Sequence, residues 1–130
     1  MNMNYVHIVA LLAIAQFLAF GVLVGRMREK YGVKAPAMTG HEMFERALRV
    51  QMNTLEQLVC FLPALLIASL YWPNAVIAGI GVVYLAGRLL YCRQYLADPA
   101  SRAPGFLLSV IPNMALLLAA LAGALLRQPA

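Results

Sequence analysis

The chain has 130 residues, of which 63% are hydrophobic, and its mean hydropathy is +0.77. Soluble globular domains contain roughly 45–50% apolar residues, and a chain this short cannot hide several long apolar helices from water. The composition therefore excludes an ordinary soluble domain. The formal net charge is +5, but membrane topology accounts for its placement along the chain, and we expect no nucleic-acid partner.

Four apolar runs follow one another along the chain. With short extensions, each can cross the bilayer core as a helix of about 20 residues. They predict membrane spans at about residues 5–25, 52–72, 75–95 and 105–126, within a single domain over residues 1–130. Pro73 separates the second span from the third, and Pro99 and Pro104 separate the third from the fourth. The predicted fold class is all-α, an integral membrane four-helix bundle.

Basic residues gather in two connecting segments. Most lie between the first two spans, and the others lie at or after the end of the third: Arg26, Arg28, Lys30, Lys34, Arg46 and Arg49, then Arg88, Arg93 and Arg102. Basic loops of multi-pass proteins face the cytoplasm, so we expect both termini on the non-cytoplasmic side. The first span has no basic residue before it and is expected to be a retained anchor, not a signal peptide. The membrane would be the cell inner membrane in a prokaryote or the endoplasmic reticulum in a eukaryote.

A polar stripe is predicted on the second helix. Thr39 and Glu42 have the spacing of a capping box, with Thr39 as the N-cap, and the helix is expected to continue to Tyr71. Four of its side chains fall within about a quarter turn of one another: Arg46, Arg49, Asn53 and Glu56. Placing a carboxylate at membrane depth costs free energy, so Glu56 is by default a candidate functional residue. The alternative is a structural ladder of ion pairs, Arg49 with Glu56 or Arg46 with Glu42.

The third helix carries a second stripe: Tyr84, Arg88, Tyr91 and Tyr95. Their spacing places them on one helical face. We expect Arg88 to pair with Glu56 and the two stripes to share a polar cleft. The alternative is an aromatic belt with a snorkelling arginine. The two cysteines, Cys60 and Cys92, are expected to be free.

Such a cleft offers guanidinium groups, amides, a carboxylate and phenol hydroxyls beside the lipid. A small anionic, peptide-like molecule with one free amine would satisfy this set, with carboxylates on the arginines and an ammonium on Glu56. Glutathione has these groups and a thiol. An apolar co-substrate could enter from the bilayer. Arg102, just before the fourth span, would by itself be read as a positive-inside anchor, and no metal site is expected.

Two motifs resemble segments of the MAPEG family, the membrane-associated proteins of eicosanoid and glutathione metabolism. The motif on the second helix is Phe44-Glu45-Arg46-x-x-Arg49-x-Gln51-x-Asn53-x-x-Glu56. The motif on the third helix is Val83-Tyr84-Leu85-x-x-Arg88-x-x-Tyr91-x-x-x-Tyr95. The resemblance covers essentially the whole chain. It implies a homotrimer with glutathione bound between neighbouring subunits, near the cytoplasmic side.

The resemblance also implies roles for individual residues. Glutathione would be held by Arg49, Gln51, Asn53, Glu56, Arg88, Tyr91 and Tyr95. Arg102 would stabilise the thiolate as the catalytic residue, and either Arg26 or Arg28 would add a basic contact. Gln57 stands where the leukotriene synthase branch has a tyrosine, which argues against carrying over its lipid substrate.

We therefore expect a membrane glutathione transferase or peroxidase, whose thiolate attacks a hydrophobic electrophile or a lipid hydroperoxide. Two alternatives stay open. A non-catalytic, lipid-binding scaffold of the same family would lack the full set of arginines and tyrosines. A small four-helix multidrug transporter would carry an acidic residue in the first span, where residues 5–24 have none.

Overall fold

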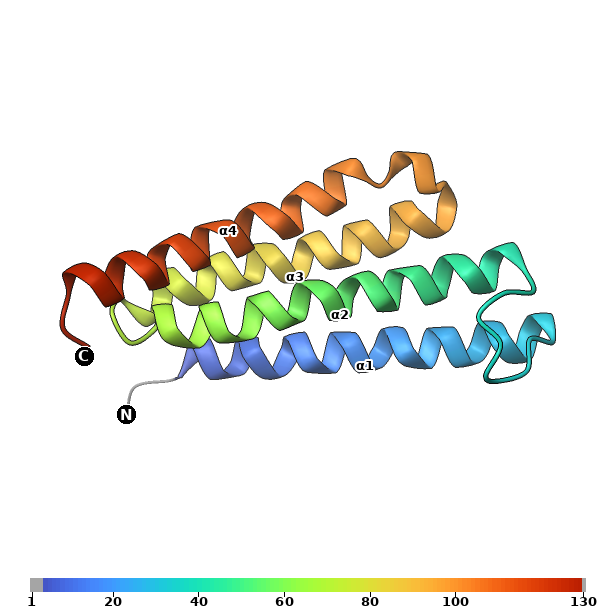
Figure 1. Cartoon of the computed structure of the whole chain (residues 1–130), viewed down its shortest axis with the longest axis horizontal. Coiled ribbons are helices and arrows are strands. Elements are labelled where there is room, and N and C mark those ends of the chain that lie inside the picture. The colour runs from blue at the N-terminus through green and yellow to red at the C-terminus, as the bar shows by residue number, and fades with distance from the viewer. Residues whose placement is uncertain (1–3, 130) are drawn as a thin grey trace.

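In the computed structural model, which describes residues 4–129, long helices run side by side along the molecule (Figure 1). They are α1 (Tyr5–Tyr31), α2 (Glu42–Ala68), α3 (Asn74–Ala97) and α4 (Ala103–Leu126), with one 3₁₀ turn, η1 (Pro99–Ser101), before α4. Residues 1–3 and 130 of the predicted domain lie outside the described residues. Because the described chain contains four helices and no strand, the predicted all-α four-helix fold is confirmed.

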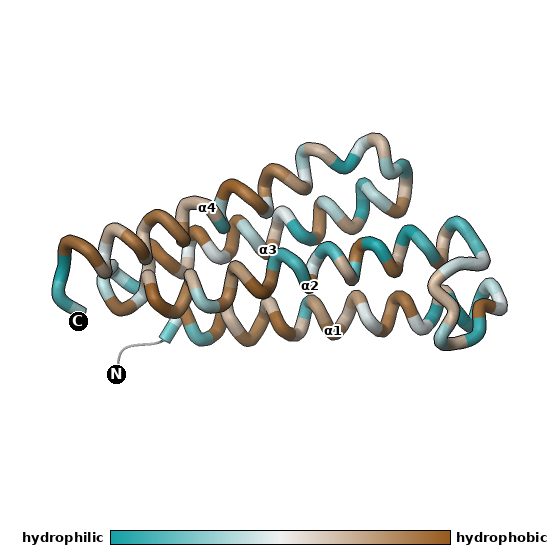
Figure 2. Tube along the Cα trace, viewed as in Figure 1, coloured by the Kyte–Doolittle hydropathy of each residue, from teal (hydrophilic) through white to brown (hydrophobic). Residues whose placement is uncertain are grey.

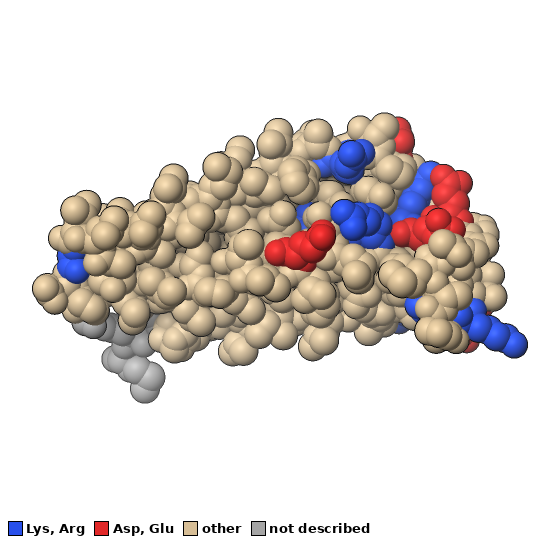
Figure 3. All heavy atoms as spheres, in the orientation of Figure 1, with Lys and Arg blue, Asp and Glu red and all other residues tan. Residues whose placement is uncertain are grey.

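Each of the four helices is long and apolar enough to cross a membrane, and most of its apolar stretch is not buried within the chain. Figure 2 shows apolar residues along most of the bundle. Figure 3 shows charged side chains gathered toward the end that holds the α1–α2 and α3–α4 connections. The chain is an integral membrane protein. The start of α1 and the end of α4 lie at the opposite end of the bundle (Figure 1), and the side of the membrane on which the termini lie stays a prediction.

The beginning of α2 differs from the predicted capping box. The N-cap is His41, whose Nδ1 accepts a hydrogen bond from the Met43 amide at 3.1 Å. The imidazole stacks on the Tyr31 ring at the end of α1, with ring centroids 3.7 Å apart. Gly40 adopts a φ of 147°, which side chains disfavour. The Thr39 cap was wrong because this turn and the stacking place His41, not Thr39, against the helix end.

The end of α2 also comes earlier than predicted. The helix stops at Ala68 instead of continuing to Tyr71. The backbone amides of Tyr71 and Trp72 both donate to the Ala68 carbonyl at 3.1 Å, which closes a turn before Pro73. The Trp72 indole donates to the Ala119 carbonyl at 2.8 Å, so the turn is attached to α4.

α3 and α4 approach each other at backbone distance. A Cβ atom added at Gly87 would lie 2.5 Å from the Leu108 carbonyl carbon, and one added at Gly105 would lie 2.4 Å from the Tyr91 nitrogen. Small residues allow helices in a membrane to pack this closely, because the helices gain van der Waals contact and no hydrophobic burial. The contact places the beginning of α4 directly beside the tyrosines of α3.

We predict that Gly87→Ala destabilises the fold by about 1–3 kcal/mol, because the added methyl group must displace the Leu108 backbone. The measurement is thermal unfolding of the purified protein in detergent. Gly25→Ala on α1 is the matched control, since a Cβ there meets nothing within 4 Å. Equal melting temperatures for the two variants would contradict the close α3–α4 contact.

Candidate functional site

A polar cavity of about 660 Å³ opens between the beginning of α4 and the charged halves of α2 and α3. Its lining residues are Arg49, Asn53, Tyr91, Tyr95, Ala100, Arg102, Ala103 and Phe106. Two guanidinium groups, an amide and two phenol rings therefore meet at one opening. Five of the residues predicted from the sequence are brought together here, and Ala100, Ala103 and Phe106 are additions.

Arg49 carries an exposed positive charge on α2. Its Nη2 lies 3.8 Å from Glu56 Oε1, and the two side chains are 52% and 61% exposed. Asn53 Nδ2 donates to the same carboxylate oxygen at 3.4 Å. The alternative of an Arg49–Glu56 ion pair is therefore observed, but an exposed pair contributes little stability. Both groups can exchange this contact for a charged ligand.

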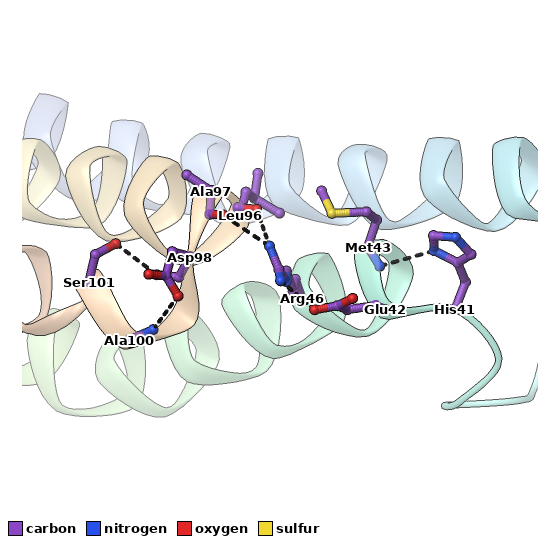
Figure 4. A network of polar contacts seen from close by, with 9 residues as sticks. All are labelled: His41, Glu42, Met43, Arg46, Leu96, Ala97, Asp98, Ala100 and Ser101. Carbon is purple, nitrogen blue, oxygen red and sulfur yellow. Dashed lines mark hydrogen bonds and ion pairs between the residues drawn. The ribbon is translucent and has the colours of Figure 1, made fainter.

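A second hollow of about 550 Å³ adjoins the cavity and shares Arg49 and Tyr95 with it. Arg46 lies here, and Figure 4 shows its side chain between Glu42 and the end of α3. Its Nη1 donates to the Leu96 carbonyl at 2.8 Å and to the Ala97 carbonyl at 3.2 Å. A cation there satisfies carbonyls that the helix end leaves free. Arg46 therefore holds α2 against α3.

Arg88 is completely buried and does not pair with Glu56, which corrects the expectation from the sequence. Its Nη1 donates to Asn53 Oδ1 at 2.8 Å and to the Thr54 hydroxyl at 3.3 Å. Its Nε donates to the Ser109 hydroxyl at 3.0 Å. The guanidinium carbon also lies 4.3 Å from the centre of the Tyr91 ring. Neutral oxygens from α2 and α4 thus bind Nε and Nη1 of Arg88, while within the described chain its buried Nη2 has no hydrogen-bond partner. Arg88 is buried in the bundle, whereas Glu56 is exposed.

The tyrosines of α3 do not form one continuous face toward the cavity. Tyr84 is buried and stacks on Phe61 of α2, with ring centroids 3.9 Å apart. Tyr91 and Tyr95, with centroids 5.6 Å apart, line the cavity. The predicted shared cleft therefore contains only the last two tyrosines of the stripe, and an aromatic belt at one depth is not observed.

Arg102 reaches the cavity from the short connection between α3 and α4. Asp98 caps η1 by accepting from the Ala100 amide at 3.1 Å (Figure 4). Arg102 ends that turn, and its Nη1 donates to the Pro99 carbonyl at 2.8 Å. Its side chain remains exposed at the cavity. Arg102, just before α4, and Arg49 on α2 therefore bring two guanidinium groups to the same opening.

Three predicted site residues lie away from this cavity within the same chain. Gln51 packs against Gly21 of α1, where an added Cβ would approach its Nε2 to 2.9 Å. Arg28 donates to the Ala37 carbonyl at 2.7 Å and lies over the Phe44 ring at 4.5 Å. Arg26 is exposed on α1. The chain by itself does not bring these three residues to Arg49 and Arg102.

The sequence interpretation missed the polar residues of α4. Ser109 is buried and holds Arg88, and Asn113 donates to the Gln57 side chain at 2.8 Å. Both residues lie four positions apart on an otherwise apolar helix, and this spacing indicates a shared inward face. This spacing could have identified Ser109 and Asn113 from the sequence alone. Among the described residues, no group of three or more His, Cys, Asp or Glu side chains could hold a metal ion.

Residues 6–122 match the sequence profile of the MAPEG family. The chain belongs to this family. It is 38% identical over 102 residues to human microsomal glutathione S-transferase 2, covering 78% of this chain and 69% of the relative. It is 45% identical over 114 residues to the uncharacterized protein sll1147 of Synechocystis, covering 88% of this chain and 83% of the relative. For leukotriene C4 synthase of Cavia porcellus, the identity is 37% over 87 residues, or 67% of this chain and 58% of the relative.

The contribution of the buried Arg88 to stability can be tested directly. We predict that Arg88→Met destabilises the bundle by about 1–3 kcal/mol, because Asn53 and its neighbours lose their donor. Thermal unfolding in detergent measures the change. Arg93→Met is the matched control, since Arg93 is exposed on the same helix. A melting temperature as high as that of the control would show that the hydrogen bonds around Arg88 add no net stability.

Proposed function

We propose that this chain is a membrane glutathione transferase that binds glutathione in the polar cavity and activates its thiol. The observation that carries the proposal is the meeting of Arg49 and Arg102 at one open cavity, at the polar end of an apolar bundle. Similarity to human microsomal glutathione S-transferase 2 supports it. The proposed co-substrate is a hydrophobic electrophile that arrives through the bilayer.

The charges at the cavity match those of glutathione. Its two carboxylates would accept hydrogen bonds from Arg49 and from a second cationic donor, and guanidinium groups bind carboxylates in two-point geometry. Its ammonium would pair with Glu56, whose carboxylate lies beside Arg49 and Asn53. Tyr91 and Tyr95 would border the peptide from α3. Arg88 would act indirectly, since its hydrogen bond holds Asn53 Oδ1 and turns the amide nitrogen toward Glu56.

Arg102 would favour the reactive form of the thiol. A free thiol has a pKa near 8.5 and is mostly protonated at neutral pH, while a nearby guanidinium stabilises the anion and lowers that pKa. The proton is released to water, so no general base is needed. The thiolate sulfur then forms a bond to an electrophilic carbon. With a lipid hydroperoxide, the sulfur takes the terminal oxygen, leaving an alcohol, and a second glutathione reduces the sulfenic acid to the disulfide and water.

To test the activation, glutathione is titrated against the protein in detergent while the ultraviolet difference absorbance of the thiolate is recorded. Wild type is expected to show a saturable thiolate band. In Arg102→Ala the pKa of the bound thiol should rise by about one unit or more, toward 8.5, so the band appears only at higher pH.

Arg93→Ala serves as the control, because it removes an exposed arginine outside the cavity. An unchanged pH profile in Arg102→Ala would remove Arg102 from the chemistry. If wild type neither binds glutathione nor shows a thiolate band, the proposal of a transferase is wrong. A lipid-binding scaffold or a transporter would then be favoured.

A homotrimer would supply the residues that one chain leaves away from its cavity. Gln51, Arg26 and Arg28 would then contact glutathione held by the neighbouring subunit. The large apolar surface left unburied within one chain is available both to lipid and to neighbouring copies. In a prokaryote the assembly would lie in the inner membrane, with the cavity on the cytoplasmic side and both termini opposite.

Coexpression of two inactive variants tests this arrangement. Arg49→Ala and Gln51→Ala chains are each expected to lose most glutathione binding. Mixed trimers should regain part of the activity, because some interfaces then combine an intact Arg49 with a neighbour's intact Gln51. The readout is conjugation by doubly tagged, copurified complexes. Activity no higher than that of the separate variants would contradict a site shared between subunits.

A further inference from the structure

An apolar groove of about 600 Å³ runs between α2 and α4, beyond the polar cavity. The two hollows follow each other along the same pair of helices. On α2, Asn53 lines the cavity and Gln57 lines the groove, and on α4 Phe106 lines the cavity and Val110 lines the groove. Each pair is about one helical turn apart, or 5.4 Å. An apolar molecule in the groove would therefore have one end beside the cavity.

A pair of amides interrupts the apolar lining at that end. Asn113 Nδ2 donates to Gln57 Oε1 at 2.8 Å and to the Gln57 backbone oxygen at 3.3 Å. A backbone oxygen only accepts hydrogen bonds, so it fixes which end of the Asn113 amide points toward it. Asn113 is left with Oδ1 as an acceptor, and Gln57 is left with Nε2 as a donor.

The Asn113 acceptor lacks a partner. The residue is 8% exposed, and within the described part of the chain no group donates to its buried Oδ1. Burying an acceptor without a donor is unfavourable, and polar side chains inside membrane spans commonly mark substrate paths. The arrangement thus combines an unused acceptor, an adjacent amide donor and a hydrocarbon-lined groove that ends near Arg49 and Arg102.

We propose that the groove holds the electrophile and that Asn113 and Gln57 recognise a hydroxyl group beside its reacting carbon. The hydroxyl would donate to Asn113 Oδ1 and accept from Gln57 Nε2. The substrate class is then a long apolar chain with an electrophilic carbon next to a hydroxylated one. This inference rests on the proposed transferase function and adds a determinant of substrate specificity to it.

For a hydroxylated α,β-unsaturated aldehyde the chemistry balances without a further reactant. The thiolate sulfur bonds to the β carbon, and the electron pair of the carbon–carbon double bond moves to the α carbon as an enolate. The enolate then takes one proton from water. The hydroxyl group is unchanged, so its contact with the amides affects only binding and orientation.

A matched pair of electrophiles tests the proposal: 4-hydroxy-2-nonenal and 2-nonenal, which differ by one hydroxyl. The purified protein is assayed in detergent with glutathione, and kcat/KM is divided by the uncatalysed rate constant of each aldehyde. Asn113→Leu and Gln57→Leu are each expected to lower the value for the hydroxylated aldehyde about tenfold, the effect of about one hydrogen bond. The value for 2-nonenal should stay within about twofold.

Gln16→Leu is the matched control, because it makes the same change at an amide on α1 that donates to the Leu85 carbonyl outside the groove. It should leave the ratio of the two aldehydes unchanged. If thermal unfolding shows that Asn113→Leu is not folded, Gln57→Leu and Asn113→Ser are used in its place.

Three outcomes would overturn the inference. Equal losses for both aldehydes would mean that the amides only join α2 to α4. If kcat/KM falls for neither aldehyde, the groove does not bind the electrophile and holds a lipid chain instead. Dissociation of the oligomer in the groove variants, with glutathione binding lost, would mean that a second copy occupies it. The proposed function fails separately, if wild type conjugates neither aldehyde and shows no thiolate band.

Discussion

The buried charge of Arg88 connects the helices that form the site. Its guanidinium binds Asn53 and Thr54 of α2 and Ser109 of α4, and it lies against Tyr91 of its own helix. A charge without partners at membrane depth would cost several kcal/mol, so α2 and α4 must present their oxygens in this register. The position of Asn53 at the cavity follows from that requirement.

The glycines of α3 and α4 satisfy a second requirement. Ser109 can reach Arg88 because Gly87 and Gly105 let the two backbones touch. The same contact brings the start of α4, and with it Arg102, to the opening beside Tyr91. The buried polar residues therefore set the register of the helices, and the small residues set the distance between them.

Polar residues on one predicted stripe turn out to have different functions. On α2, Arg46 satisfies the last carbonyls of α3, while Arg49 stays exposed at the cavity. On α3, Tyr84 stacks inside the core, Arg88 holds neighbouring helices, and only Tyr91 and Tyr95 reach the cavity. Helical periodicity predicts a common face, but a face about 60° wide contacts two neighbours and an opening at the same time. Which residue meets which surface depends on the crossing of the helices.

The sequence by itself determined the helical fold, its membrane nature and the residue types at the cavity, because apolar length and the spacing of charges are local properties. It also carried the motifs by which the chain resembles its family. The tertiary structure decided that Arg88 binds neutral oxygens and that Glu56 remains beside Arg49. It decided as well that His41 caps α2 and that Asn113 meets Gln57. These contacts join positions on different helices or across a turn, and their geometry depends on side-chain packing that no single helical period specifies.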